Sequence, residues 1–196
     1  METEKQKASQ GRLYDANYDE ELLRERTACA DLIFEFNHTL RPSQQTEKEA
    51  LLRRILGKAK NNFTILSPFF CDYGYNIEVG ENVFINMNCV VLDEAKVTFG
   101  DNVFVAPGCG FYTAGHPLDV EQRNQGLEYA LPIVIEDNVW IGGGVSVLPG
   151  VTIGTGSVIG AGSVVNRNIP AGVIAAGNPC KVIRPITEAD KNKYRK

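Results

Sequence analysis

The side chains best suited to acid–base chemistry near neutral pH are two histidines, His38 and His116, because an unperturbed imidazole titrates close to that range. His116 lies in a segment of eighteen residues, GHPLDVEQRNQGLEYALP, which interrupts an otherwise regular repeat. Long loops within compact folds are frequently functional. His116 is therefore a candidate general base, and Glu128, in the same segment, is a candidate to orient the imidazole or to bind a substrate hydroxyl.

The remaining candidates for chemistry are weaker. His38 stands at the end of a predicted helix and is better explained as a packing or capping residue. The five cysteines are an odd number without a CxxC pair. This pattern indicates reduced thiols in a cytoplasm rather than a disulfide framework.

Composition excludes several classes of partner. A net charge of −4 and a pI near 5.3 argue against general binding to nucleic acid or to an anionic membrane. The N-terminus METEKQKASQ is polar, so no signal peptide is expected. No apolar run reaches the roughly 20 residues needed to cross a bilayer. We therefore expect a soluble cytoplasmic protein.

Residues 133–168 form six consecutive hexads, IVIEDN VWIGGG VSVLPG VTIGTG SVIGAG SVVNRN. An apolar column recurs every six residues from Ile135 to Val165, and a column of small or branched residues stands two positions before it. No helix has this period, whereas two apolar positions separated by one residue fit one face of a short strand. Glycine and asparagine between them suit corners with positive φ. Since one hexad cannot bury its apolar residues alone, the pattern predicts a parallel β-helix.

Similar hexads precede the interruption: IEVGEN VFINMN CVVLDE and, after Ala95 and Lys96, VTFGDN VFVAPG CGFYTA. Three hexads per turn would make a triangular prism with coils about 4.8 Å apart. The sequence predicts four full coils, with a two-residue bulge in the first and a long loop after the second. Flat faces and an open end favour a symmetric oligomer.

A small helical unit is predicted before the repeat. Apolar residues recur at helical spacing over residues 19–40, and Asp19 suits the helix start. A second helix is predicted over residues 46–58, with Thr46 and Glu49 as a capping box.

The predicted fold class is mainly β, with a small N-terminal α-helical unit. The first eleven residues are predicted to be a mobile tail. The predicted parts of the chain are a helical unit (1–60), a β-helix (61–186) with an inserted loop (115–132), and a charged tail (187–196).

The runs CDYGYNIEVGENVFINMNCVVLD, YTAGHPLD, NVWIGGGVSVLPGVTIG and AAGNPCKVIR follow one another along the chain. With them, residues 11 to about 186 resemble the maltose/galactoside O-acetyltransferase family. The resemblance implies a left-handed parallel β-helix, a homotrimer with active sites between subunits, and acetyl-CoA as donor to a sugar hydroxyl. The handedness comes from the resemblance alone, because crossovers between parallel strands are ordinarily right-handed.

The resemblance also implies roles for single residues. It makes His116 the catalytic base, with Glu128 beside it. The acceptor sugar is expected to contact Asn17 or Asp15, Asp72, Asn86, Asp93 and Glu94. Asp72 replaces the serine of galactoside-specific members, so the preferred acceptor stays open. Coenzyme A is expected in a groove between two prisms, on Gly143, Ala161, Asn166, Arg167, Lys181 and Arg184.

The expected chemistry is direct transfer without a metal. His116 would take the proton of the attacking hydroxyl, the Gly143 amide would stabilise the oxyanion, and His116 would then protonate the departing thiolate. An acyl-enzyme on Cys109 or Cys71 is the rival mechanism, although Cys109 falls at an inward position of its hexad.

Three other functions compete with a sugar acetyltransferase. A zinc carbonic anhydrase on the same fold needs three histidines, and the chain has two. An acetyltransferase of an antibiotic or another small hydroxyl compound would use the same chemistry. A non-catalytic hexapeptide-repeat binding protein is the third, and the intact His116 loop argues against it.

Overall fold

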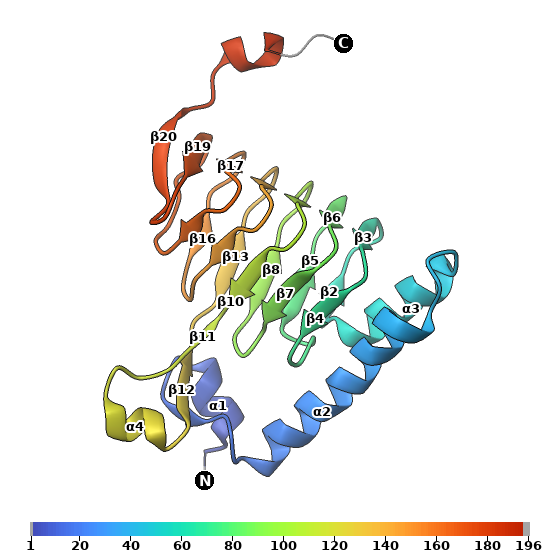
Figure 1. Ribbon diagram of the computed structural model, residues 1–196, viewed down its shortest axis with the longest axis vertical. Helices are drawn as coiled ribbons and strands as arrows, with labels where there is room; N and C mark the ends of the chain where they lie inside the picture. The colour runs from blue at the N-terminus through green and yellow to red at the C-terminus, as the bar shows by residue number, and fades with distance from the viewer. Residues whose placement is uncertain (1, 194–196) are drawn as a thin grey trace.

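The computed structural model describes residues 2–193, and its largest part is a triangular prism of short strands (Figure 1). The chain crosses three faces in a fixed order, so strands of successive coils pair in parallel on each face. The prism is a left-handed parallel β-helix of about six turns, which confirms the predicted fold class.

Each face of the prism is one sheet. The first face consists of β2 (Lys58–Ala59), β5 (Ile77–Val79), β8 (Val97–Phe99), β13 (Ile133–Ile135) and β16 (Thr152–Ile153). The second consists of β3 (Phe63–Ile65), β6 (Val83–Ile85), β9 (Phe104–Val105), β14 (Trp140–Ile141), β17 (Val158–Ile159), β19 (Val173–Ala176) and the antiparallel β20 (Lys181–Pro185). The third consists of β4 (Phe69–Cys71), β7 (Cys89–Leu92), β10 (Gly110–Tyr112), β15 (Ser146–Val147) and β18 (Val164–Val165).

The prism has more coils than the four that the sequence predicts. Five complete coils run from β2 to β18, and a partial sixth adds an isolated bridge at Ile169 and strand β19. The coil missing from the prediction is the first, whose inward column is Ala59, Ile65 and Cys71. Its strands keep the spacing of six, but a small side chain and a thiol in this column weaken the apolar signal.

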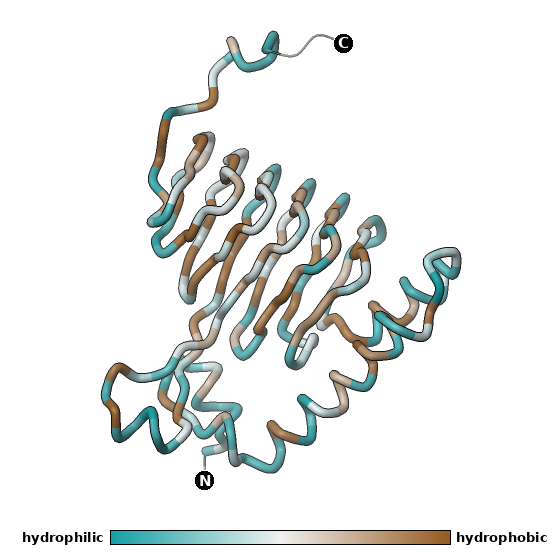
Figure 2. Tube along the Cα trace, viewed as in Figure 1, coloured by the Kyte–Doolittle hydropathy of each residue, from teal (hydrophilic) through white to brown (hydrophobic). Residues whose placement is uncertain are grey.

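The interior of the prism is filled by the inward columns, and the strands in Figure 2 carry brown, hydrophobic segments along its length. An aromatic pair in the middle coils is formed by Phe99 and Phe111, which are 1% and 0% exposed. Their ring centroids lie 5.0 Å apart at 81°. This edge-to-face packing is favourable for aromatic pairs.

Asparagines at the corner between the first and second faces confirm that the corners need positive φ. Asn82, Asn102 and Asn138 have φ values of 54°, 56° and 61°. Their side chains form a ladder from coil to coil, with amide hydrogen bonds of 3.1 and 3.3 Å. The backbone therefore turns where the repeat predicts, and the side chains tie neighbouring coils together.

The predicted first helix is confirmed. Helix α2 (Glu20–Phe34) begins after Asp19, whose carboxylate accepts the N–H of Leu22, and continues as a π-helix, η1 (Glu35–Thr39). Helix α3 (Gln45–Ile55) also forms, but Gln44 is its N-cap, without a side-chain hydrogen bond, so the predicted capping box of Thr46 and Glu49 is wrong. Among residues 2–193, no helix combines the length and apolarity needed to span a membrane.

The prediction of a mobile tail at the N-terminus is wrong for the described residues. Helix α1 (Glu4–Ser9) has a capping box between Thr3 and Gln6. The carboxylate of Glu4 accepts the N–H of Asp15 at 2.7 Å, which ties the helix to the following strand. The helix is held by polar contacts and its sequence has no apolar periodicity. A search for a hydrophobic pattern therefore could not reveal it.

The predicted loop after the third face is a folded insertion. Strand β11 (Ala114–Gly115), helix α4 (Val120–Asn124) and strand β12 (Leu127–Ala130) follow one another, and β12 also pairs with β1 (Tyr14–Asp15) of the N-terminal unit. Beyond the prism, the short 3-10 helix η2 (Glu188–Asn192) ends the described elements. The small sheet β1-β12-β11 therefore joins the N-terminal unit to the insertion (Figure 1).

Insertions into the repeat gather at one corner, between the third and first faces, which we call the insertion corner. Along the chain, the last inward residue before this corner and the corresponding inward residue after it are Cys71 and Val79, Val91 and Phe99, and Phe111 and Ile135. These steps exceed six residues, whereas Val147 to Ile153 keeps six. Additional residues can be accommodated only at a corner, where they project outside the prism, because the inward columns must stay in register. Three successive coils thus build one outgrowth.

Phe111→Ala tests how strongly the stacked interior holds the prism. Loss of a fully buried ring should lower the free energy of unfolding by about 3–5 kcal/mol, measured by denaturant unfolding. Phe34→Ala is the matched control, since that ring on α2 is 62% exposed and its removal should cost less than about 1 kcal/mol. Equal losses in the two variants would contradict a packed interior.

Candidate active site

His116 follows β11 at the start of the insertion, and its side chain is 50% exposed. The Nδ1 atom lies 3.1 Å from the carbonyl oxygen of Leu127 on the facing strand β12. Because a carbonyl only accepts, this contact places the proton of the neutral ring on Nδ1. The Nε2 lone pair is then left to accept a proton from another molecule, as a general base requires.

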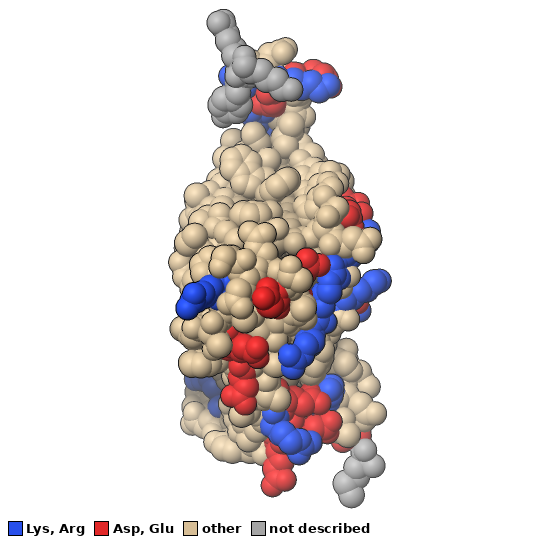
Figure 3. Space-filling model, turned by 90° about the vertical axis from the view of Figure 1, so that its right-hand side faces the viewer, with Lys and Arg blue, Asp and Glu red and all other residues tan. Residues whose placement is uncertain are grey.

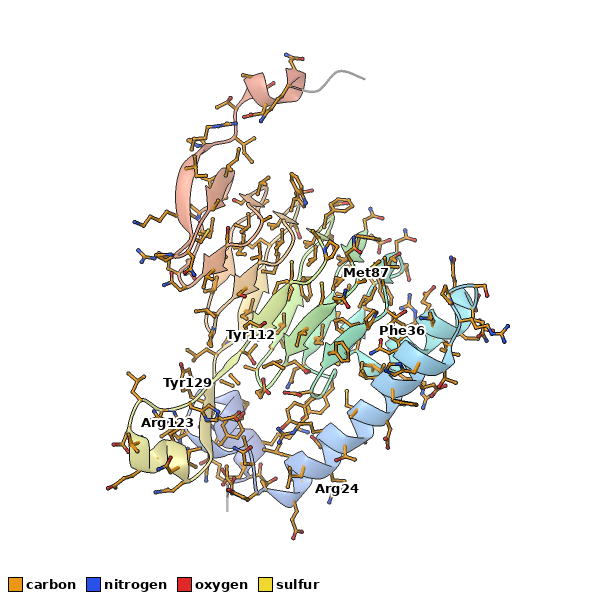
Figure 4. The ribbon with its side chains drawn as sticks, viewed as in Figure 1. Arg24, Phe36, Met87, Tyr112, Arg123 and Tyr129 are labelled. Atoms are coloured by element: carbon orange, nitrogen blue, oxygen red, sulfur yellow. The ribbon has the colours of Figure 1, made fainter. Side chains whose placement is uncertain are left out.

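The backbone around His116 is held from both sides. A Cβ on Gly115 would lie 2.5 Å from the ring of Tyr129, so only glycine allows this close packing. Arg123 of α4 donates to the carbonyls of Pro117 and Leu118 at 3.2 and 3.1 Å, which closes the insertion on itself. Figure 4 shows Tyr129 and Arg123 in the insertion below the prism.

Glu128 lies on the reactive side of the imidazole. Its Oε1 is 3.8 Å from Nε2 of His116, and its Oε2 accepts the hydroxyl proton of Tyr14 at 3.1 Å. The carbonyl of Leu127 holds the Nδ1 side of the ring, so Glu128 can act on the imidazole only from the Nε2 side. Its place beside Nε2 fits the alternative, a contact with the molecule that gives up its proton.

Asp72 and Glu94 form a pair of carboxyl groups at the same corner. Burial, followed by a hydrogen bond with Asp72 and its charge, raises the pKa of Glu94 to about 9. The Thr113 hydroxyl lies 3.3 Å from Oε2 of Glu94. Glu94 is therefore a neutral acid at neutral pH, and with Asp72 it offers both a donor and acceptors to a ligand hydroxyl.

Asp93 supports the backbone instead. Its side chain is fully buried, and its carboxylate accepts the N–H groups of Asp72, Tyr73 and Asn76 at 3.1, 2.9 and 3.3 Å. Burial raises its pKa to about 6, although these donors act in the opposite direction. The predicted contact of Asp93 with an acceptor does not fit this position, because no part of its carboxylate reaches the surface.

The two N-terminal candidates also have partners within the chain. The amide of Asn17 donates to the carbonyl of Gly126 at 2.7 Å, which fastens the N-terminal unit to the insertion. Asp15 Oδ1 accepts the N–H groups of Asn17 and Tyr18 at 3.2 and 2.9 Å. Asp15 is the second residue of β1 and Asn17 follows it closely, so these hydrogen bonds help to hold the strand in place.

Asn86, Gly143 and Ala161 lie at a different corner, between the second and third faces. Asn86 caps its own corner by accepting the N–H of Met87 at 2.8 Å. No acceptor within residues 2–193 binds the N–H of Gly143, and a Cβ there would approach only one atom, 3.4 Å away. The third face separates these residues from His116, so one chain alone does not bring them together.

The predicted coenzyme A ligands fall near the C-terminal end of the prism. Asn166 and Arg167 follow β18 at the insertion corner and are exposed, as is Lys181 at the start of β20. Arg184 forms two hydrogen bonds with the carboxylate of Asp190, at 2.6 and 2.8 Å. Arg167 and Lys181 are therefore more open to a phosphate than Arg184.

Neither cysteine considered for an acyl-enzyme is suited to attack. The Cys109 thiol is buried against the carbonyls of Ala106 and Gly142, both at 3.2 Å. The pKa of Cys71 is raised by a hydrogen bond with Cys29, whose sulfur is 3.7 Å away, and by burial. Both thiols stay protonated at neutral pH, which removes the nucleophilic form.

Sequence reasoning missed the aromatic and hydroxyl groups behind the carboxylates. Tyr14 and Tyr73 are 1% and 5% exposed, and with Glu94 they line a cavity of about 590 Å³ under α1. The hydroxyl of Tyr73 is a buried side-chain polar atom without a partner in the described chain. Tyr14 belongs to no repeat, so only its pairing opposite Glu128 reveals it.

Comparisons with known proteins agree with this arrangement. A model described as the maltose acetyltransferase hexapeptide capping motif matches residues 7–60, and one for six bacterial transferase hexapeptides matches residues 132–167. A protein of Saccharomyces cerevisiae, named for an assumed acetyltransferase activity, is 59% identical over 95% of both chains. The chain belongs to the maltose/galactoside O-acetyltransferase family.

Solved structures of family members have the same fold. The crystal structure of a maltose O-acetyltransferase from Clostridium difficile 630 has a TM-score of 0.91 and 50% identity, and the match covers 95% of this chain and 98% of that one. A galactoside acetyltransferase in complex with coenzyme A has a TM-score of 0.92 and 42% identity, with coverage of 97% and 94%. Residues 2–193 contain no group of three or more potential metal ligands.

Glu94→Gln tests the neutral acid through the pH dependence of stability. The pKa of Glu94 rises from 4.5 to about 9 on folding, so the native state keeps a proton that the unfolded state loses in between. Stability therefore falls as pH rises through this window. Glutamine cannot ionise, so the melting temperature of the variant relative to wild type should rise from about pH 5 to pH 9.

The matched control is Glu47→Gln, an exposed carboxylate on α3. Its melting temperature should follow that of the wild type at every pH. A constant difference between Glu94→Gln and wild type would show that Glu94 is ionised in the native protein.

Proposed function

We propose that this protein transfers the acetyl group of acetyl-CoA to a hydroxyl of a sugar of the maltose, glucose or galactoside type. The observation that carries the proposal is the held imidazole of His116, with Nδ1 on a carbonyl and Nε2 open beside Glu128. Membership of a sugar acetyltransferase family and a relative crystallised with coenzyme A support the donor and the acceptor class.

In the proposed reaction, Nε2 of His116 accepts the proton as the sugar oxygen attacks the thioester carbonyl. The Gly143 N–H, which has no acceptor in the described chain, donates to the oxyanion. The carbon–sulfur bond then breaks, and the imidazolium returns its proton to the thiolate of coenzyme A. Asp72, Glu94 and Glu128 hold the remaining hydroxyls of the sugar.

A homotrimer with shared active sites would bring the two corners together. The second face exposes a row of apolar side chains, including Phe104 and Trp140, which are paired neighbours and 52% and 55% exposed. Figure 3 shows charged side chains mainly on the lower part of one side of the molecule, below a broad uncharged zone. An exposed apolar face of this kind favours contact with another subunit.

Coenzyme A would lie in the cleft between two prisms, with Ala161 beside its pantetheine arm. Arg167, Lys181 and Asn166 would meet its adenine and phosphates, and Arg184 would join them by exchanging Asp190 for a phosphate. Five cysteines, an odd number without a CxxC pair, are in keeping with reduced thiols in a cytoplasmic enzyme.

His116→Ala tests the general base. Turnover should fall by about 100- to 10,000-fold, measured as release of free coenzyme A thiol with a panel of sugars and other small hydroxyl compounds. Acetyl-CoA should still bind in calorimetry, because the imidazole is placed at the acceptor. His38→Ala, which removes the other histidine, should leave turnover unchanged. Near-normal turnover in His116→Ala would reject the base assignment.

Subunit complementation tests the shared site. Gly143→Val should block acyl transfer without disturbing the fold, since the nearest atom to a Cβ there is 3.4 Å away. Coexpression of equal amounts of His116→Ala and Gly143→Val chains should restore about a quarter of wild-type turnover. After random mixing, about one site in four combines an intact His116 from one chain with an intact Gly143 from its neighbour. If each site lies within one chain, the mixture will stay inactive.

A further inference from the structure

The N-terminal strand β1 reaches the catalytic group through a single side chain. Tyr14 stands directly opposite Glu128 in the antiparallel pair β1-β12. Its hydroxyl donates to Oε2 of Glu128 at 3.1 Å, and its ring is 1% exposed. The contact therefore joins residues that are far apart in the sequence at the point where the N-terminal unit meets the insertion.

Tyr14 is the sole hydrogen-bond donor to the Glu128 side chain within residues 2–193. The two carboxylate oxygens have separate tasks, because Oε2 is held by Tyr14 and Oε1 points toward Nε2 of His116 at 3.8 Å. Only 14% of the Glu128 side chain is exposed, so water cannot readily replace this donor. Without the phenol, the carboxylate could rotate away from Nε2.

The surroundings keep Tyr14 in its donor form. Burial, followed by the charges of Glu128 and Glu94, raises the pKa of the phenol far above its usual range. A phenol that stays protonated can donate at every pH at which the protein is folded. Its ring also lines the cavity under α1, and Asn17 fastens the same segment to Gly126 at 2.7 Å.

We propose that Tyr14 is a positioning residue of the active site, which aims Oε1 of Glu128 at the place of the acceptor beside Nε2 of His116. This inference rests on the proposed function. When a hydroxyl sits on Nε2, Oε1 lies close enough to accept a second hydroxyl of the same sugar. The N-terminal helical unit thereby takes part in acceptor binding, although its helices do not touch the reacting atoms.

A double-mutant cycle tests the proposal. Tyr14→Phe removes only the hydroxyl and should lower kcat/KM for the acceptor about 10-fold, with the KM for acetyl-CoA unchanged. Glu128→Ala should lower kcat/KM for the acceptor by at least as much. If Tyr14 acts through Glu128, adding Tyr14→Phe to Glu128→Ala should change kcat/KM by less than about twofold.

The matched control is Tyr75→Phe. Tyr75 likewise donates to a carboxylate, Glu25 Oε2 at 2.6 Å, but this contact ties α2 to the prism and involves neither Glu128 nor His116. Tyr75→Phe should leave both KM values and kcat unchanged. Thermal unfolding and size-exclusion chromatography of every variant separate loss of fold or assembly from loss of positioning.

Three outcomes overturn the inference: wild-type kinetics in Tyr14→Phe, an equal loss with acetyl-CoA and with acceptor, or multiplied losses in the double variant. If Tyr14→Phe does not fold, Glu128→Ala alone decides, since normal acceptor kinetics would leave Tyr14 nothing to position. Failure of the proposed function looks different, because wild-type protein would then release no thiol with any acceptor.

Discussion

The structure depends on the stacking of inward side chains from one coil to the next. Each apolar residue in a column covers the one before it, so the interior stays filled only while the strands remain in register. Residues added within a strand would break every column after them. Additions are tolerated only at corners, where the chain can leave the prism and return in phase. The position of the candidate active site follows from this constraint.

The insertion corner collects the groups to which the proposed function assigns the chemistry. Its first turn supplies Asp72, its second supplies Glu94, and its third supplies His116 and Glu128. Stacked coils bring three carboxyl groups close together in a partly buried place, where water cannot separate their charges. The repulsion between these groups is reduced because Glu94 stays protonated and because Glu128 accepts a hydrogen bond from the hydroxyl of Tyr14. A site rich in hydrogen-bonding oxygens is suited to a sugar.

The N-terminal unit closes this corner from outside. Strand β1 is joined to the insertion by backbone pairing and by the Asn17 amide, and Glu4 ties helix α1 to this strand. Helix α2 approaches the first coil through the contact of Cys29 with Cys71. The open end of the prism and the back of the site are thus covered by the same unit, which explains why a helical cap precedes the repeat in one chain. The second face is not covered by this unit and is the surface that the proposed homotrimer would bury.

The sequence by itself determined the prism and the corners and singled out His116 as the proposed base, because a period of six and a histidine in its longest interruption are local features. It did not reveal the first coil, whose Ala59 and Cys71 carry little apolar signal, or helix α1, which rests on polar caps. Tertiary structure alone decided which nitrogen of His116 is free, that Asp93 faces the backbone, and that Tyr14 supports Glu128. These features depend on contacts between segments that are distant in the sequence, and such contacts cannot be inferred from the spacing of residues along the chain.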